Sequence, residues 1–194
     1  MNIIYDKTQS AFIFQFDFRN LEVSVKLLSV DYDTRQIKLS LISSERSFGK
    51  ATNDLQDRVI EILGPGEYEY AGIYVTAMEI MNDDKQDYLG CINFLVFSFQ
   101  DVYFVYVPFK VNLKNLSINF KDQNKIILIV DNKYQSEWIA EILKFLKVSS
   151  ILSSNIEIIS TNDLSSQKSI IKSQKVKLNQ LFGNTLQIIY LTSD

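Results

Sequence analysis

Histidine is absent from the 194 residues of this chain, and cysteine occurs only once. A serine or cysteine nucleophile is usually activated by an imidazole base, and zinc sites are built mostly from imidazole and thiolate ligands. The sequence therefore excludes Ser-His-Asp triads, Cys-His dyads, and histidine-rich or multi-cysteine zinc sites within one chain. Magnesium and calcium sites stay open, because these cations take carboxylate and carbonyl oxygens.

A charge excess, long apolar segments and paired cysteines are lacking as well. The formal net charge of -3 offers no basic field to nucleic acid or anionic lipid. No segment approaches the roughly 20 apolar residues of a membrane span, and the start MNIIYDKTQS has no signal-peptide pattern. The single thiol, Cys91, cannot form an internal disulfide and is expected to be a small buried hydrophobe. We therefore expect a cytoplasmic protein that binds neither nucleic acid nor membrane.

The residues that are present predict one folded domain, residues 1–194. Apolar residues make up 46% of the chain and charged residues 22%, a balance that can build a packed core. In the stretch FIFQFDF, the four phenylalanines are expected on one face of a strand and the polar residues on the other. Runs rich in β-branched and aromatic residues predict further strands. These strands are expected at 21–28, 37–42, 59–62, 73–80, 92–99 and 102–107.

The second half of the chain has a different pattern. Lys125–Val130 reads KIILIV, a continuous apolar run typical of a strand buried on both faces. Ser136 is expected to cap a helix over EWIAEILKFLKV, whose apolar residues recur at helical spacing. A strand at 150–158 would complete a right-handed βαβ unit, and 186–191 predicts a closing strand. Many strands followed by such a unit predict two packed sheets covered by helices.

Two segments have less definite predictions. Residues 48–58 favour a short helix with Thr52 or Asn53 as its cap. Residues 160–174 form a polar, serine-rich passage in which no element is predicted. The aromatic strands at 94–109 offer an apolar surface that a partner could bind, but packing in the core explains their composition more simply.

The stretch LGPGEYEYAG gathers three of the six glycines and one of the two prolines. Gly64 and Gly66 permit turn conformations and Pro65 fixes its own φ, so a rigid turn between two strands is expected. Glu67 and Glu69 would share one face of an extended backbone. There they could hold a cation or a proton between them, satisfy backbone amides or a basic partner, or face water. A phosphate loop is not expected, because strand-like residues follow where a helix should begin.

With its flanks, GPGEYE resembles the small bacterial metallo-β-lactamase-fold hydrolases related to the L-ascorbate-metabolism lactonase. In that family a strand and a histidine-rich metal loop, a short helical passage, and a phrase like GPGEYE with a glycine-containing strand follow in this order. The same order occurs here at 38–49, 50–58 and 64–77, and KVKLNQLFGNTLQIIYL resembles the family's closing segment. The resemblance implies an α/β (α+β) fold, a four-layer αββα sandwich of two mixed β-sheets flanked by helices. It also implies zinc-dependent hydrolysis for the family.

Transferred position by position, the family's first metal motif falls on residues that cannot replace its ligands. The motif, HxHxDH, corresponds to four residues of ISSERSFG: Ser44, Arg46, Phe48 and Gly49. Ser44 is a weak neutral ligand and Arg46 is a permanent cation. Phe48 and Gly49 offer no side-chain donor. No zinc is therefore expected at this motif.

The other ligand positions have changed too. The bridging aspartate falls near Pro108 and Phe109, the late histidine near Asn155, and a further histidine at about Asn82. The family's two-metal, water-activating chemistry then has no means of operating. The resemblance therefore implies a catalytically inactive member without a cofactor, kept as a binding or assembly scaffold. Its partner would be an unknown protein, a second copy of the chain or an active paralogue.

Acidic residues keep a second hypothesis open. Under the same alignment, Glu45, Asp83 and Asp84 lie near the former site and can bind a hard cation. The chain would then be a metal-dependent hydrolase with a relocated or carboxylate-only site, acting on an ester, lactone or phosphodiester. Alternatively, Arg46 pairs with one of these carboxylates and fills the emptied site. The Asp83-Asp84 pair also suits a turn.

Overall fold

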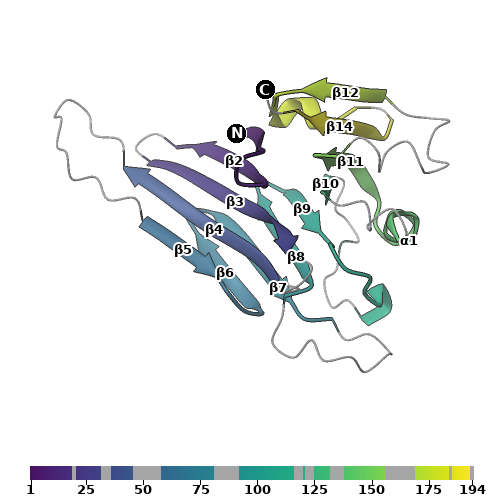
Figure 1. Cartoon of the computed structure of the whole chain (residues 1–194), viewed down its shortest axis with the longest axis horizontal. Coiled ribbons are helices and arrows are strands. Elements are labelled where there is room, and N and C mark those ends of the chain that lie inside the picture. The colour runs from purple at the N-terminus through teal and green to yellow at the C-terminus, as the bar shows by residue number, and fades with distance from the viewer. Residues whose placement is uncertain are drawn as a thin grey trace.

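The computed structural model describes residues 1–18, 21–31, 36–45, 58–80, 92–115, 120, 125–131, 138–155, 169–183 and 185–192. Within these residues the chain forms two β-sheets that lie face to face (Figure 1). Sheet A has six strands in the order β13-β1-β2-β3-β4-β5, and sheet B has eight in the order β12-β14-β11-β10-β9-β8-β7-β6. The described fold is mainly β, and the prediction of two packed sheets is confirmed.

Sheet A follows chain order except at one edge, where β13 pairs with β1. Its strands are β1 Asn2–Asp6, β2 Ala11–Asp17, β3 Leu21–Asp31, β4 Gln36–Glu45, β5 Arg58–Ile62 and β13 Lys175–Lys177. All of its described strand pairs are antiparallel. The expectation that both sheets are mixed is therefore wrong for sheet A, because only a few residues connect β1 to β2, β2 to β3 and β3 to β4, too few for the crossover that a parallel neighbour needs.

Sheet B is mixed. Its strands are β6 Gly66–Tyr70, β7 Ile73–Met78, β8 Phe94–Phe99, β9 Val102–Tyr106, β10 Ile126–Val130, β11 Val148–Ser153, β12 Ser169–Ser173 and β14 Gln187–Leu191. β6 to β9 pair as antiparallel neighbours. β9, β10, β11, β14 and β12 are parallel to one another. The predicted βαβ unit is present as β10, the α-helix α1 (Ile139–Phe145) and β11.

Alternation in the strands builds the core between the sheets. Phe12, Phe14 and Phe16 are buried on the inner face of β2, as predicted, and Asp17 is exposed. Phe14 packs edge to face against two rings of sheet B, Phe97 and Phe104, at centroid distances of 4.8 and 5.0 Å. Such aromatic pairs add about 0.5–1.5 kcal/mol each to the free energy gained by burial. The phenylalanines of FIFQFDF therefore join the two sheets.

A second apolar cluster covers the outer face of sheet B. Ile126, Leu128 and Val130 of β10 face this cluster, whereas the alternate residues Ile127 and Ile129 face the core between the sheets. The apolar run Ile126–Val130 of KIILIV is therefore buried on both faces, as predicted. The outer cluster is closed by apolar side chains at or beside α1: Trp138, Ile139, Ile142 and Leu146.

Only part of the expected helical cover is present in the described residues. α1 lies on the far side of sheet B from sheet A (Figure 1). It is shorter than the predicted helix and ends before Leu146, whose backbone is already extended towards β11. The described parts of the chain contain no second α-helix and no helix long and apolar enough to cross a membrane. The predicted helix at 48–58 lies outside the described residues except for Arg58, which begins β5 and is not helical. The burial of Cys91, the cap Ser136 and the part of the 160–174 passage before 169 also lie outside them.

Candidate functional site

Parallel strands bring two of the predicted ligand positions to one edge of sheet B. β9, β10 and β11 are adjacent and parallel, so their carboxyl ends lie at the same edge. Pro108 follows β9, Asp131 follows β10 and Asn155 follows β11. Neighbouring strands lie about 4.8 Å apart, so roughly 10 Å of sheet width separates Pro108 from Asn155. Ligands of open α/β sheets bind outside this kind of edge.

Neither position supplies a metal ligand of the expected kind. The side chain of Pro108 is a hydrocarbon ring without a donor atom. Asn155 is tied to the end of β11, because the Ser153 hydroxyl donates to the Asn155 carbonyl at 2.9 Å and the Asn155 amide donates back at 3.1 Å. Pro108 and Asn155 lie at the same edge of sheet B, but their side chains do not supply ligands that could hold zinc.

Structural hydrogen bonds occupy the neighbouring polar groups of this edge. The Tyr106 hydroxyl donates to Asp131 Oδ2 at 2.7 Å, and the Trp138 indole donates to the Val107 carbonyl at 3.3 Å. Asn93, which is 3% exposed, accepts from the Ile80 amide at 2.7 Å and donates to the Ile80 carbonyl at 2.8 Å. These bonds join the ends of β7, β9, β10 and α1 to their neighbours.

Ser44 lies towards the opposite edge of the sandwich. β4 runs antiparallel to β3, and the Ser43 hydroxyl lies 2.7 Å from the Tyr70 hydroxyl. Tyr70 pairs with Ile73 at the point where the β6–β7 hairpin turns. The carboxyl end of β4 therefore lies at the hairpin end of β7.

Pro108 lies beyond the other end of β7. Met78 closes β7 and pairs with Phe94, which stands opposite the end of β9. β7 has six residues, and a strand rises about 3.3 Å per residue, so its two ends are about 17 Å apart. The structure thus keeps Ser44 away from Pro108 and Asn155 by about the length of a strand. The described positions carried over from the family, Ser44, Pro108 and Asn155, therefore do not meet at one end of the sheets.

Several predicted positions lie outside the described residues. They are Arg46, Phe48, Gly49, Asn82, Asp83 and Asp84. For Glu45 the structure describes the backbone, at the end of β4. The ion pair suggested for Arg46 and the hard-cation site suggested for the acidic residues therefore stay predictions. In the described part of the chain there is no group of three or more acidic or cysteine side chains placed to hold a metal.

The GPGEYE stretch is a corner between the two sheets. Gly64 and Pro65 connect β5 of sheet A to β6 of sheet B, as the sequence predicted. The Tyr68 hydroxyl donates to the Gly64 carbonyl at 2.8 Å, and a Cβ on Gly66 would lie 3.2 Å from that hydroxyl. Glycine at this position therefore leaves room for the tyrosine ring against the turn.

Tyrosines rather than glutamates fix this corner. Glu67 and Glu69 share one face of β6, as predicted, and both are exposed. Neither carboxylate forms a hydrogen bond or ion pair with any other part of the described chain. Tyr70 instead links β6 to β4 through Ser43, and Tyr68 closes the turn. Of the alternatives for the glutamates, exposure to water is the one observed.

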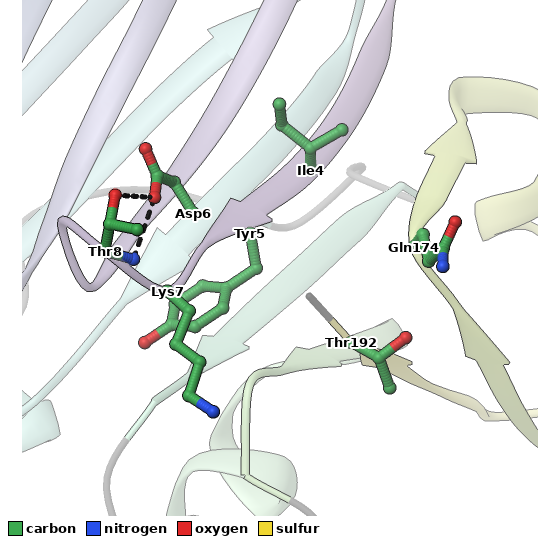
Figure 2. A pocket seen from close by; sticks show the side chains of 7 residues that line it. All are labelled: Ile4, Tyr5, Asp6, Lys7, Thr8, Gln174 and Thr192. Atoms are coloured by element: carbon green, nitrogen blue, oxygen red, sulfur yellow. Dashed lines mark hydrogen bonds between the residues drawn. The ribbon is translucent and has the colours of Figure 1, made fainter. Parts of the chain in front are cut away.

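A hollow of about 400 Å³ lies next to the carboxyl ends of β12 and β14 (Figure 2). It is lined by Ile4, Tyr5, Asp6, Lys7, Thr8, Gln174 and Thr192. The first five residues belong to β1 and the turn into β2, and the last two follow β12 and β14. Three segments far apart in the sequence therefore meet around this hollow.

The turn beside the hollow is held by Asp6. Its Oδ1 accepts from the Thr8 hydroxyl at 2.6 Å, the Thr8 amide at 2.9 Å and the Gln9 amide at 3.3 Å. The hydroxyl of Thr8, the two amides and the positive charge of Lys26 hold the pKa of Asp6 below its ordinary value of 3.8. Sequence reasoning did not single out this turn, although an aspartate two residues before a threonine is a local signal for it.

Comparisons with models of protein families, with curated proteins and with solved structures find no match for this chain.

Proposed function

We propose that this chain is a non-catalytic protein with a metallo-β-lactamase-like sandwich, acting as a binding or assembly scaffold. Three features support the proposed fold: two sheets packed face to face, a GPGEYE corner leading into sheet B, and the order β10-α1-β11. The four-layer form of that sandwich would need a helical layer over sheet A in addition to α1.

The course of β4 is the observation that carries the proposed loss of catalysis. A two-metal site needs its ligands within a few ångströms of one ion, since metal–ligand bonds are about 2.0–2.3 Å long. The strand that would deliver the first motif ends beside Tyr70 instead of beside Pro108. Substituting histidines at the changed positions would therefore not restore the site.

Zinc, the metal implied by the resemblance, does not fit the residues at the carboxyl edge of sheet B. Pro108 has no donor atom, and Asn155 offers a neutral amide in place of an imidazole. Asp131 is an acidic residue at this edge, and its Oδ2 already accepts a hydrogen bond from the Tyr106 hydroxyl.

Metal analysis together with a hydrolase screen tests the proposal. The purified protein would be analysed for bound metals by mass spectrometry. It would then be assayed on ester, lactone and phosphodiester substrates with and without added zinc, manganese and magnesium. We expect neither a stoichiometric metal nor metal-dependent turnover. Turnover that disappears in Asp131→Asn would contradict the proposal and support the alternative, a hydrolase with a carboxylate-only site.

Assembly would use the open edge of sheet A, with a second copy of the chain as the partner. β5 pairs with β4 on one side only in the described structure, and its region exposes Val59 (54%), Ile60 (38%) and Leu63 (60%). Two β5 strands could pair in antiparallel orientation about Ile60, with a two-fold axis between the two copies. The pairing would join the two copies of sheet A into one continuous sheet, with the core-facing sides of both copies on the same side.

A matched pair of variants tests this interface. Val59→Lys places a charge at the β5 edge, and Phe145→Lys does the same at a residue of α1 that is 47% exposed. Light scattering coupled to size exclusion should show a dimer for the parent chain and Phe145→Lys, and a monomer for Val59→Lys. A monomeric parent chain, or equal behaviour of both variants, would contradict the β5 interface.

A further inference from the structure

We infer that the hollow between the β1–β2 turn and the ends of β12 and β14 binds a small organic anion, whose carboxylate or phosphate group contacts Lys7. This inference rests on the proposed function, because it states what a binding protein of this shape would bind. The described positions carried over by the family resemblance, Ser44, Pro108 and Asn155, are not among the residues that line the hollow.

The ammonium group of Lys7 is the contact that the hollow offers to an anion. Lys7 is exposed, and its ammonium group forms no hydrogen bond or ion pair with any residue in the described ranges. Asp6, the neighbouring carboxylate, is ionised, but its Oδ1 is held on its own turn by three hydrogen bonds and it forms no ion pair with Lys7. A lysine ammonium without a partner beside a concave surface is a ready site for a carboxylate or phosphate.

Polar groups on the opposite wall can complete the contact. Figure 2 shows Tyr5 and Lys7 on one side of the hollow and Gln174 and Thr192 on the other. The Thr192 amide donates to the Ser173 carbonyl at 3.0 Å, which fixes the position of this residue after β14. The Thr192 hydroxyl has no partner within the described chain and can donate to an anion.

The apolar residues of the hollow suggest that the ligand carries an apolar group besides its anionic group. Ile4 and Tyr5 line the hollow, and the Tyr5 ring is held edge to face against Phe12 at a centroid distance of 5.1 Å and an angle of 61°. A ring fixed in this way presents a defined surface to a planar or aliphatic group. The volume of about 400 Å³ lies at the small end of the range for ligand pockets, roughly 300–1,000 Å³, so the ligand is a small molecule.

Amide chemical shifts measure this binding directly. The ¹⁵N-labelled full chain would be titrated with phenyl phosphate, with benzoate and with the neutral benzyl alcohol. We expect saturable shifts at Thr8 and Thr192 with at least one of the two anions and none with the alcohol. The two anions separate a phosphate ligand from a carboxylate ligand.

Variants then assign the contact to Lys7. Lys7→Gln should weaken binding of the effective anion about tenfold, which is the loss expected for one charge-assisted contact at a partly exposed site. Thr192→Val should weaken it by a smaller factor. Lys144→Gln, which removes an exposed lysine from α1, should leave binding unchanged. The spectra themselves show whether each variant is folded.

Two results would overturn the inference. One is the absence of saturable shifts at Thr8 and Thr192 with both anions, and the other is equal affinity of the parent chain and Lys7→Gln. Release of inorganic phosphate from phenyl phosphate, followed in the same samples, reports on the proposed function instead. Binding with turnover would contradict the non-catalytic role and leave the anion site intact, so the two failures can be told apart.

Discussion

Asn93 provides a stringent test of whether the carboxyl edge of sheet B has a structural role. This side chain precedes β8, is 3% exposed, and bonds both polar groups of the Ile80 backbone, at 2.7 and 2.8 Å. The backbone N–H of Asn93 donates to the Met78 carbonyl at 3.0 Å. The side chain of Asn93 therefore takes the place of a backbone partner for Ile80, and it extends the hydrogen bonding between β7 and β8 beyond the last residue of β7.

The size of the effect follows from the groups that Asn93→Ala would leave unpaired. A buried amide or carbonyl without a partner costs about 1–3 kcal/mol, so losing both bonds to Ile80 should reduce the free energy of unfolding by about 2–6 kcal/mol. Asn93→Asp keeps an acceptor for the Ile80 amide but, when ionised, cannot donate to the Ile80 carbonyl. It also buries a charge, so it should be destabilised as well.

Urea unfolding followed by the fluorescence of Trp138, the single tryptophan, measures these changes. Asn179→Ala, in the exposed 3₁₀-turn Leu178–Leu181, is the control and should change stability by less than about 0.5 kcal/mol. If Asn93→Ala were as stable as this control, with an unchanged dependence on urea, the structural role assigned to Asn93 would be refuted.

Three further changes test other parts of the structure. Phe14→Ala removes the ring between Phe97 and Phe104 and should lower the unfolding free energy by about 3–5 kcal/mol in the same urea assay; less than about 1 kcal/mol would contradict the packing between the sheets. Tyr106→Phe removes the donor to Asp131 and should lower it by about 1.5–3 kcal/mol, because the acceptor is a carboxylate. Asp6→Asn tests the pH dependence. The folded pKa of Asp6 is lowered, so its contribution to stability is present above about pH 3.8 and is lost as the pH falls through the folded pKa. The variant should show a weaker loss of stability in acid than the parent chain, and identical acid unfolding curves would count against the Asp6 turn.

Much of the sandwich follows from periodicity in the sequence. The alternating phenylalanines from Phe12 identify the inner face of β2, and the continuous run Ile126–Val130 identifies a strand buried on both faces. Both patterns report burial directly, since strand side chains alternate between the two faces of a sheet. The turn at Gly64 and Pro65 could also be predicted from the sequence, because the backbone geometry of a turn restricts which residues can occupy it.

Other strands leave a weaker signal. β12, Ser169–Ser173, lies within a passage predicted to have no element, and its Ile170 and Ile171 are 54% and 37% exposed. An edge strand has one neighbour and little burial, so its composition resembles that of a polar loop. β1, Asn2–Asp6, was missed for a related reason, since four of its five residues are only partly buried.

The site was harder to predict than the fold. Pro108 and Asn155 reach one edge because β9, β10 and β11 are parallel, and the order of elements in the sequence made this pairing predictable. Ser44 does not reach that edge, because the direction of β4 depends on its connection to β3, and strand composition does not reveal direction. The hollow at Lys7 joins three distant segments, a proximity that one sequence without its fold does not encode.

The proposed loss of the two-metal centre rests on the end of β4 lying beside Tyr70, and nuclear Overhauser contacts measure that position most directly. The ring protons of Tyr70 should show contacts to the β-protons of Ser43, whose hydroxyl lies 2.7 Å from the tyrosine hydroxyl. A contact between Ser44 and Pro108 or Asn155 in place of these would mean that the ligand positions converge, and would contradict the proposed loss of the metal centre.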